Sequence, residues 1–326
     1  MRARRPARGA LLIALSAAGY GVMPVLIRMA YDDGARPFGL LSVRFIAAFL
    51  VMLIVLTAGG ALRGVRIGRR SFGKLLLLGG VFFAGTSITL YLSVGLLAPS
   101  VAELIYFSYP GFVLLIAAIF LKERIGAAKV AGLLVMLAGV ALTVAGPFIM
   151  GMLHREGAPA AIHAAGFADK AGGANGMGGS NAIGAGLAVL CALVYSLYVT
   201  FIHDRDVEAA GPALISLFVA GCCAVIFTVA MMATGEGLPH LGMRGTLALA
   251  GIVVFSTVLP IFLFAAGSRE LPASEVAMIA CLEPAVTVLA DILALGRRFD
   301  PATASGLVFI GAGLVALTFL RKGREA

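Results

Sequence analysis

Apolar residues fill the chain in runs of about twenty, and short clusters of charged and polar residues separate the runs. A helix of that length spans a hydrocarbon core of about 30 Å. Backbone polar groups in lipid must be paired, and these runs are about twice as long as a barrel strand, so helices are the expected form. The pattern predicts an all-α integral membrane protein with ten transmembrane helices, at residues 9–30, 37–58, 74–96, 100–121, 127–149, 183–202, 211–233, 246–267, 273–296 and 302–320.

Composition agrees with this pattern. The 326 residues are 61% hydrophobic and 13% charged, with a mean hydropathy of +1.04, whereas a soluble domain is about half apolar and a quarter charged. The net charge of +9 does not indicate a nucleic-acid partner, because the spans leave no soluble basic face. The four cysteines lie inside apolar runs and are interpreted as packing residues, so neither disulfides, metal nor cofactor is expected.

Basic residues favour one side of the predicted membrane. With the N-terminus in the cytosol, the cytosolic ends and loops hold 17 Lys and Arg and the outer loops hold seven. Cytosolic loops are enriched in such residues. We therefore expect a multi-pass protein of the cell membrane, inner or plasma, with both termini in the cytosol.

The chain repeats itself. An offset of 174 residues gives 11 identities over the 44 positions 100–143, and an offset of 175 superposes Tyr20 on Tyr195. This predicts a first five-helix repeat at 1–150, a flexible outer-side linker at 151–182 and a second five-helix repeat at 183–326. Five is odd, so the second repeat would enter the membrane inverted, an architecture that suits alternating access around a central site.

Several short motifs recur in both halves. In the first half they are Arg44, Ala98-Pro99-Ser100, Pro110, Leu-Lys-Glu123-Arg and Gly132 to Gly139; in the second they are Leu271-Pro-Ala-Ser274, Glu283-Pro284 and Gly306 to Gly313. Their order resembles the EamA-type family of the drug/metabolite transporter superfamily. The resemblance implies a secondary transporter that exports metabolites such as amino acids, or drugs, and it favours a monomer, since the fused halves replace the dimer of shorter relatives. One departure is Arg297, which stands where the first repeat has Glu123.

Three ionisable residues lie within the outer halves of predicted spans, where charge is costly and marks candidate function. At about 1.5 Å per residue, Arg44 lies about 10 Å, Asp291 about 9 Å and Glu103 about 5 Å below the outer surface. Arg44 is expected either to pair with Asp291 or Glu103, or to meet an anionic substrate group. The alternatives are that Arg44 extends toward lipid headgroups and that Glu103 is a carboxylate of a first helical turn.

Glu283 is the strongest candidate, because it stands near the middle of the ninth span, where transporters place substrate and coupling-ion sites. The following Pro284 lacks an N–H and is expected to kink the helix, as Pro110 would in the fourth span. Glu283 is a candidate for proton exchange during transport; the alternative is a neutral glutamate packed between helices. Glu275, at the cytosolic start of this span, is expected at the membrane interface.

The remaining candidates are residues that could line a cavity or that pack helices together. Tyr20 and Tyr195, midway along the first and sixth spans, could line a cavity together with other tyrosines, or could simply pack. Small residues two turns apart favour close helix approach. They are Gly132, Gly139, Gly306 and Gly313.

The sequence has no Gly-x4-Gly-Lys-Ser/Thr phosphate loop, which disfavours a built-in ATP motor. It also lacks His-Glu-x-x-His or paired aspartates within the spans, so an enzyme is not expected. The predicted partners are membrane lipid, a small-molecule substrate and protons as coupling ion. The alternative function is an uncoupled channel or facilitator.

Overall fold

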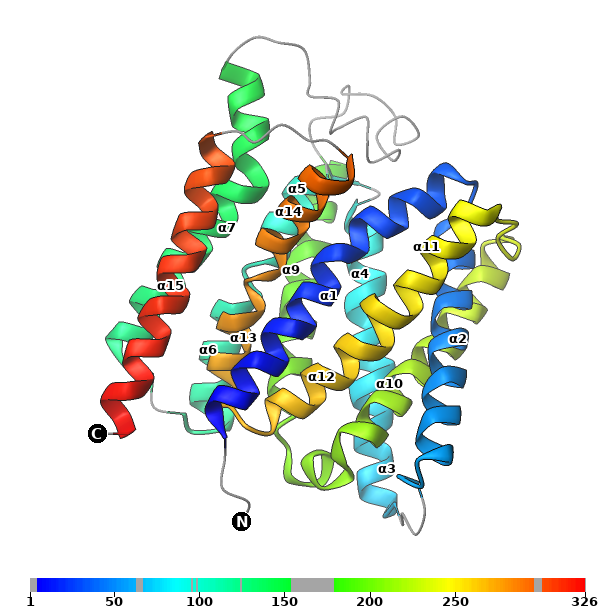
Figure 1. The fold of residues 1–326 in the computed structure, drawn as a ribbon, viewed down its shortest axis with the longest axis horizontal. Helices are drawn as coiled ribbons and strands as arrows, with labels where there is room; N and C mark the ends of the chain where they lie inside the picture. Colours follow the sequence, from blue (N-terminus) through cyan, green and yellow to red (C-terminus); the bar gives the residue numbers. More distant parts are fainter. Residues whose placement is uncertain are drawn as a thin grey trace. The chain divides into compact units, whose positions relative to one another are not determined.

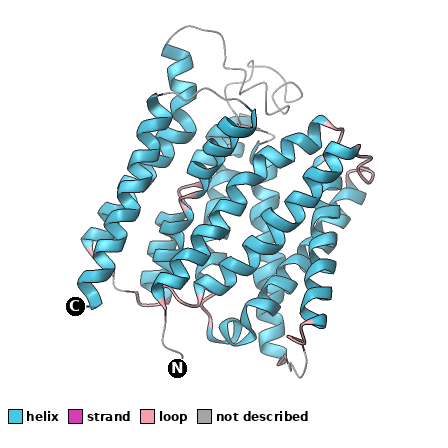
Figure 2. Ribbon diagram, viewed as in Figure 1, coloured by secondary structure: helices cyan, strands magenta, loops and turns pink. Residues whose placement is uncertain are grey.

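The structure is a computed structural model that describes residues 5–62, 67–94, 96–97, 99–123, 125–153, 179–295 and 301–325. Within these ranges every regular element is helical (Figures 1 and 2). The elements are α1 Pro6–Asp32, α2 Pro37–Ala58, α3 Arg69–Leu76, η1 Leu77–Phe83, α4 Ala84–Val94, α5 Pro99–Tyr106, α6 Tyr109–Phe120, α7 Ala127–Leu153, α9 Gly179–Phe201, α10 Arg205–Ala233, α11 Met243–Val253, η2 Val254–Val258, α12 Leu259–Ser268, α13 Ala273–Ala280, α14 Glu283–Leu295 and α15 Pro301–Glu325. Arg297 and most of the predicted linker lie outside the described residues.

The outer surface of these helices is apolar. Among the described residues, nine helical segments are long and apolar enough to cross a membrane, and a further apolar stretch, Pro301–Ala316, is shorter. Leu293, Phe120 and Met232 are 86%, 74% and 73% exposed. Large side chains exposed in such number match a lipid environment rather than water. The described helices are therefore those of a multi-pass membrane protein.

Helix α10 begins earlier than the sequence pattern predicts. Apolar residues dominate only from position 211, but the helix starts at Arg205, because the Asp204 side chain caps it by accepting a hydrogen bond from the backbone N–H of Asp206. At Gly211 the backbone leaves helical geometry, with φ 82° and ψ 162°, just before Pro212. Glycine tolerates this conformation and the residue before proline is displaced from the helical region, so the first turn and the apolar span are joined by a kink.

Two spans contain π-helical segments that the sequence analysis did not predict. Segment η1 lies between α3 and α4, and η2 lies between α11 and α12. Under the repeat offset of 174 residues, Phe83 at the end of η1 corresponds to Thr257 within η2. Such wider turns disturb the regular backbone pairing and occur often at functional sites. The interruption is thus shared by corresponding spans of the two repeats.

The chain forms two compact units, each built from parts of both repeats. The first unit comprises Met1–Ala84 and Tyr198–Pro272, and the second comprises Gly85–Leu197 and Ala273–Ala326. In the first unit α2 packs along α10, and α1 packs against α11, η2 and α12. In the second unit α7 packs along α15 (Figure 1), and α6 packs against α13. Packing therefore joins helices that are far apart in sequence.

Glycines bring α7 and α15 into backbone contact. A Cβ added at Gly139 would lie 2.7 Å from Ile310 N and 2.8 Å from Gly306 O. A Cβ added at Gly306 would lie 2.7 Å from both Gly139 O and Thr143 N. No side chain fits at these distances, so the two helices approach each other only because both positions are glycine.

Replacing Gly306 with alanine is expected to lower the free energy of unfolding by about 1–3 kcal/mol, because the backbones of α7 and α15 must separate. The matched control is Gly311→Ala on the same helix, where nothing lies within 4 Å of the added Cβ. Alanine there should leave stability unchanged or raise it by up to about 1 kcal/mol through helix propensity. Thermal unfolding in detergent measures both; equal effects of the two substitutions would contradict the packing argument.

Candidate functional site

The fourth and ninth spans are each broken near the middle, at corresponding positions. The fourth divides into α5 and α6, and the ninth into α13 and α14. Helix α6 begins at Tyr109 and helix α14 at Glu283, which correspond under the offset of 174 residues. Pro110 and Pro284 are the second residues of these helices. Each proline removes a backbone donor where the helix would otherwise continue.

One backbone hydrogen bond is common to the two breaks. Ser108 N donates to Ile105 O at 3.0 Å in the fourth span, and Leu282 N donates to Ile279 O at 3.1 Å in the ninth. Both are bonds to the third preceding residue, which tighten the last turn before the break. The two breaks therefore share this hydrogen bond, while the side chain that follows is a tyrosine in one repeat and a glutamate in the other.

Three tyrosines of the second unit form a triangle beside the break between α5 and α6. The ring centroid of Tyr109 lies 4.7 Å from that of Tyr195 and 5.3 Å from that of Tyr106, and the Tyr106 and Tyr195 rings are 5.6 Å apart. Tyr109 is 1% exposed and Tyr195 is 8% exposed. Helices α5, α6 and α9 thus place aromatic side chains of both repeats at one point.

Acidic side chains of the second unit adjoin these rings. Glu283 lies within electrostatic range of Tyr106 and Tyr109. It also lies within range of Glu103, which in turn interacts with Asp291. All three carboxyl groups are partly buried. We call this set the carboxylate–tyrosine cluster; its members are Glu103, Tyr106, Tyr109, Tyr195, Glu283 and Asp291.

The repeat does not duplicate the acidic residues. Under the offset of 174 residues Glu103 corresponds to Ala277, and Asp291 corresponds to Ala117. Each of these carboxylates therefore occurs in only one of the two repeats. The positions of the helix breaks are repeated, but the acidic residues near them are not.

The hydroxyl of Tyr109 is buried and has no hydrogen-bond partner among the described residues. Leaving a buried hydroxyl unpaired costs about 1–3 kcal/mol. Its neighbours include the Glu283 carboxyl and the Tyr195 ring. The cluster therefore holds a buried polar group whose hydrogen-bonding capacity is not used by the described residues.

Arg44 lies in the first unit and is 5% exposed. Its Nε donates to Thr257 Oγ1 at 2.7 Å, and its Nη2 donates to Ser256 O at 3.1 Å. The guanidinium carbon lies 4.8 Å from the centroid of the Phe45 ring. These contacts are with neutral groups of η2 and of its own helix, so Arg44 is buried within the unit rather than extended toward headgroups. Its pairing with Asp291 or Glu103 stays a prediction.

Tyr20 and Tyr195 belong to different units. Tyr20 lies within electrostatic range of Arg44 and of Tyr198, whereas Tyr195 belongs to the carboxylate–tyrosine cluster. Their equivalence under the repeat thus does not give them the same surroundings. Gly132 and Gly313, like Gly139 and Gly306, lie on the facing helices α7 and α15.

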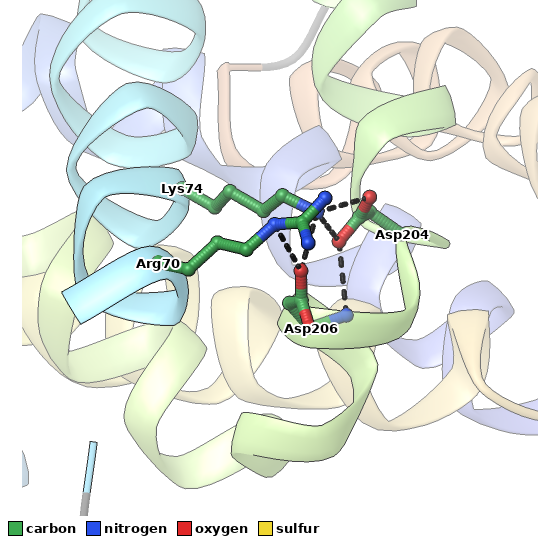
Figure 3. Close-up of polar contacts among 4 residues, drawn as sticks. All are labelled: Arg70, Lys74, Asp204 and Asp206. Atoms are coloured by element: carbon green, nitrogen blue, oxygen red, sulfur yellow. Dashed lines mark hydrogen bonds and ion pairs between the residues drawn. The ribbon is translucent and has the colours of Figure 1, made fainter. Parts of the chain in front are cut away.

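An ion network in the first unit was not predicted from the sequence. Lys74 Nζ on α3 lies 2.6 Å from both Asp204 Oδ1 and Asp206 Oδ2 (Figure 3). The more exposed Arg70 joins the network, with its Nε 3.3 Å from Asp206 Oδ2. The only sequence signal was the pair of aspartates before the kink at Gly211, and nothing in it indicated which helix they would contact.

A second network lies in the second unit and is more deeply buried. The Glu123 carboxylate accepts hydrogen bonds from Ala273 N at 2.7 Å and Ser274 Oγ at 2.6 Å. Lys129 Nζ donates to Ser274 Oγ at 2.6 Å and lies 3.9 Å from Glu123 and 3.8 Å from Glu275. Glu275, expected at the membrane interface, is only 6% exposed. It is buried because α13 packs within the unit and Lys129 compensates its charge.

In the described part of the chain, no group of three or more His, Cys, Asp or Glu side chains is arranged to hold a metal ion. The four cysteines are free thiols, three of them buried.

Comparison with known proteins agrees with this architecture. One solved structure, described only as a crystal structure of a protein, is 18% identical, with a TM-score of 0.74 over 99% of this chain and 100% of that chain. At that identity the likeness concerns the fold. No curated protein sequence matches the chain significantly. The model of the EamA-like transporter family matches twice, at residues 7–145 and 182–319. The two matches cover most of the chain, which therefore belongs to the EamA-like transporter family of the drug/metabolite transporter superfamily.

Proposed function

We propose that the protein is a secondary transporter that exports small organic metabolites, such as amino acids, or drugs, by alternating access. The observation that carries this proposal is the meeting of the two repeats in the carboxylate–tyrosine cluster. Broken helices place polar side chains and free backbone groups near the membrane midplane, where transporters bind substrates and ions. Here Tyr109 is the first residue of α6 and Glu283 is the first residue of α14, the helices that follow the two breaks.

The proposed topology has ten membrane-spanning helices in two inverted repeats, with α15 as the tenth. The excess of basic residues in alternate loops favours cytosolic termini in the cell membrane. We further propose a monomer, because the fused repeats supply both halves of the transport path. Exchange of conformation between the repeats would then expose the cluster to each side in turn.

Glu283 is the proposed proton-coupling residue. Among the described residues it has no ion-pair partner, and its electrostatic neighbours are two tyrosines, the Cys281 thiol and another carboxyl group. Without a fixed counter-charge, such a carboxylate can gain or lose a proton as the solvent that reaches it changes. Glu103, Asp291 and the tyrosine hydroxyls supply further contacts for a polar solute.

The experiment is flux into liposomes that contain the purified protein, screened against amino acids and cationic drugs over a wide concentration range. A carrier must complete a conformational cycle for each solute, so its flux saturates. Saturation with at least one solute class is expected. Flux that rises linearly with concentration for every permeant solute would instead support the channel or facilitator.

A further inference from the structure

Arg44 presents a buried positive charge that the first unit does not neutralise. A desolvated cation is costly unless an anion or several hydrogen bonds compensate it. The guanidinium has five N–H donors, and the contacts to Thr257 and Ser256 engage its Nε and Nη2. Both acceptors are neutral, so the charge itself stays uncompensated within the unit.

The carboxylates of the first unit are placed elsewhere. Glu236 binds the first N–H groups of α2, Asp33 binds Gly245 N, and Glu270 binds Arg5 N. The others lie at helix ends or in the loop before α10. They are Asp32, Asp204, Asp206 and Glu208. In the described part of this unit none forms an ion pair with Arg44.

A second observation points to a ligand at the same place. Ser256 is 0% exposed, and its hydroxyl has no hydrogen-bond partner among the described residues, although its own backbone carbonyl accepts a hydrogen bond from Arg44. Ser256 and Thr257 lie in η2, where the helix is locally widened. The buried cation of α2 therefore contacts the backbone of a residue of η2 whose own hydroxyl is buried and unpaired.

The surroundings favour an organic anion. Phe45 lies under the guanidinium and stacks on Phe227, with ring centroids 5.4 Å apart. Tyr20 and Tyr31 lie within electrostatic range of Arg44. A planar guanidinium beside aromatic rings matches a carboxylate that carries an apolar body, since its fork binds both carboxylate oxygens and the rings pack against the remainder.

We infer that Arg44, with the hydroxyl of Ser256, forms a carboxylate-binding subsite, so that the transported solutes are organic acids or amino acids rather than purely cationic compounds. This inference rests on the proposed transport function, which it makes more specific. In this arrangement the solute carboxylate supplies the missing counter-charge. The residues of the subsite belong to the first unit, whereas those of the carboxylate–tyrosine cluster belong to the second.

The test measures binding rather than flux, by thermal shift of the purified full-length protein in chloride-free buffer. The probes are three acids, each compared with its amide: hexanoate, 3-phenylpropanoate and leucine at millimolar concentration. A ligand that binds only the folded state raises the unfolding temperature. At least one acid should stabilise the wild type more than its amide does. Equal stabilisation by all acids and amides, or equal stabilisation by chloride, would overturn the inference.

Variants assign the effect to the subsite. Arg44→Met should weaken binding of the acid about 10- to 100-fold, the range for charge-assisted hydrogen bonds, and Ser256→Ala about 3- to 10-fold. The matched control is Ser42→Ala, which removes a buried hydroxyl of α2 that forms a hydrogen bond with the hydroxyl of Thr228. Its acid affinity should equal that of the wild type. If Arg44→Met does not fold, Ser256→Ala and the acid–amide comparison still test the subsite. Acid binding by Ser256→Ala as tight as that of the wild type would then count against it.

The outcome separates the subsite from the function on which it rests. Saturable flux of solutes without an acid–amide difference would retain the transporter and remove the subsite. Acid-specific binding that depends on Arg44, without flux of any solute, would retain the subsite and remove the transporter.

Discussion

Glu283→Gln is expected to abolish the dependence of transport on a pH gradient while the protein stays folded. Glutamine keeps the size and hydrogen-bonding capacity of the side chain but cannot exchange a proton. The substitution also leaves no basic side chain without its counter-charge, because Glu283 has no ion-pair partner among the described residues. The measurement is solute flux into liposomes at a fixed solute gradient, with and without an imposed pH difference.

The matched control for this substitution is Glu208→Gln, which removes a carboxylate from the first turn of α10, outside the cluster. It should retain the pH response of the wild type. A pH response that survives in Glu283→Gln would reduce Glu283 to a packing residue and move the coupling role to Glu103 or Asp291.

Lys129→Met is expected to be the most destabilising single substitution proposed here, at about 3–5 kcal/mol, because removing one partner of a buried ion network leaves the others uncompensated. The side chain of Lys129 is 6% exposed, and those of Glu275 and Glu123 are 8% and 14% exposed. Thermal unfolding in detergent measures the loss.

Two further variants test the cause of that loss. Adding Glu275→Gln to Lys129→Met removes one of the two stranded charges and should restore part of the stability. Lys74→Met breaks a network of similar composition whose carboxylates are more exposed, so its effect should be smaller. Equal losses for Lys74→Met and Lys129→Met would contradict the role of burial.

The helical segments and their repeat were predictable from sequence because both depend on local properties. Runs of about twenty apolar residues define the spans, and the second span, 37–58, coincides with α2. The prolines at 110 and 284 likewise marked the interruptions, since the missing N–H acts on the backbone of its own helix. The start of α10 was wrong by six residues because a polar cap, rather than apolar composition, begins that helix.

The partners of the charged side chains were not predictable in the same way. Depth along a span suggested Asp291 or Glu103 as a partner of Arg44, and that pairing stays a prediction, because depth does not fix the rotation of a helix about its axis. The structure places Asp291 near Glu103 and gives Arg44 the hydroxyl of Thr257 on η2. These contacts depend on tertiary packing and on π-helical turns, for which no residue pattern in the chain gave a signal.

The most direct test of transport by alternating access is counterflow in liposomes loaded with an excess of unlabelled solute. Because a carrier must reorient between binding events, internal solute should accelerate the entry of labelled solute and drive its transient accumulation above equilibrium. Alternating access predicts such accumulation for at least one organic solute. Entry that is indifferent to internal solute, with no accumulation for any solute that permeates, would contradict it and indicate a channel.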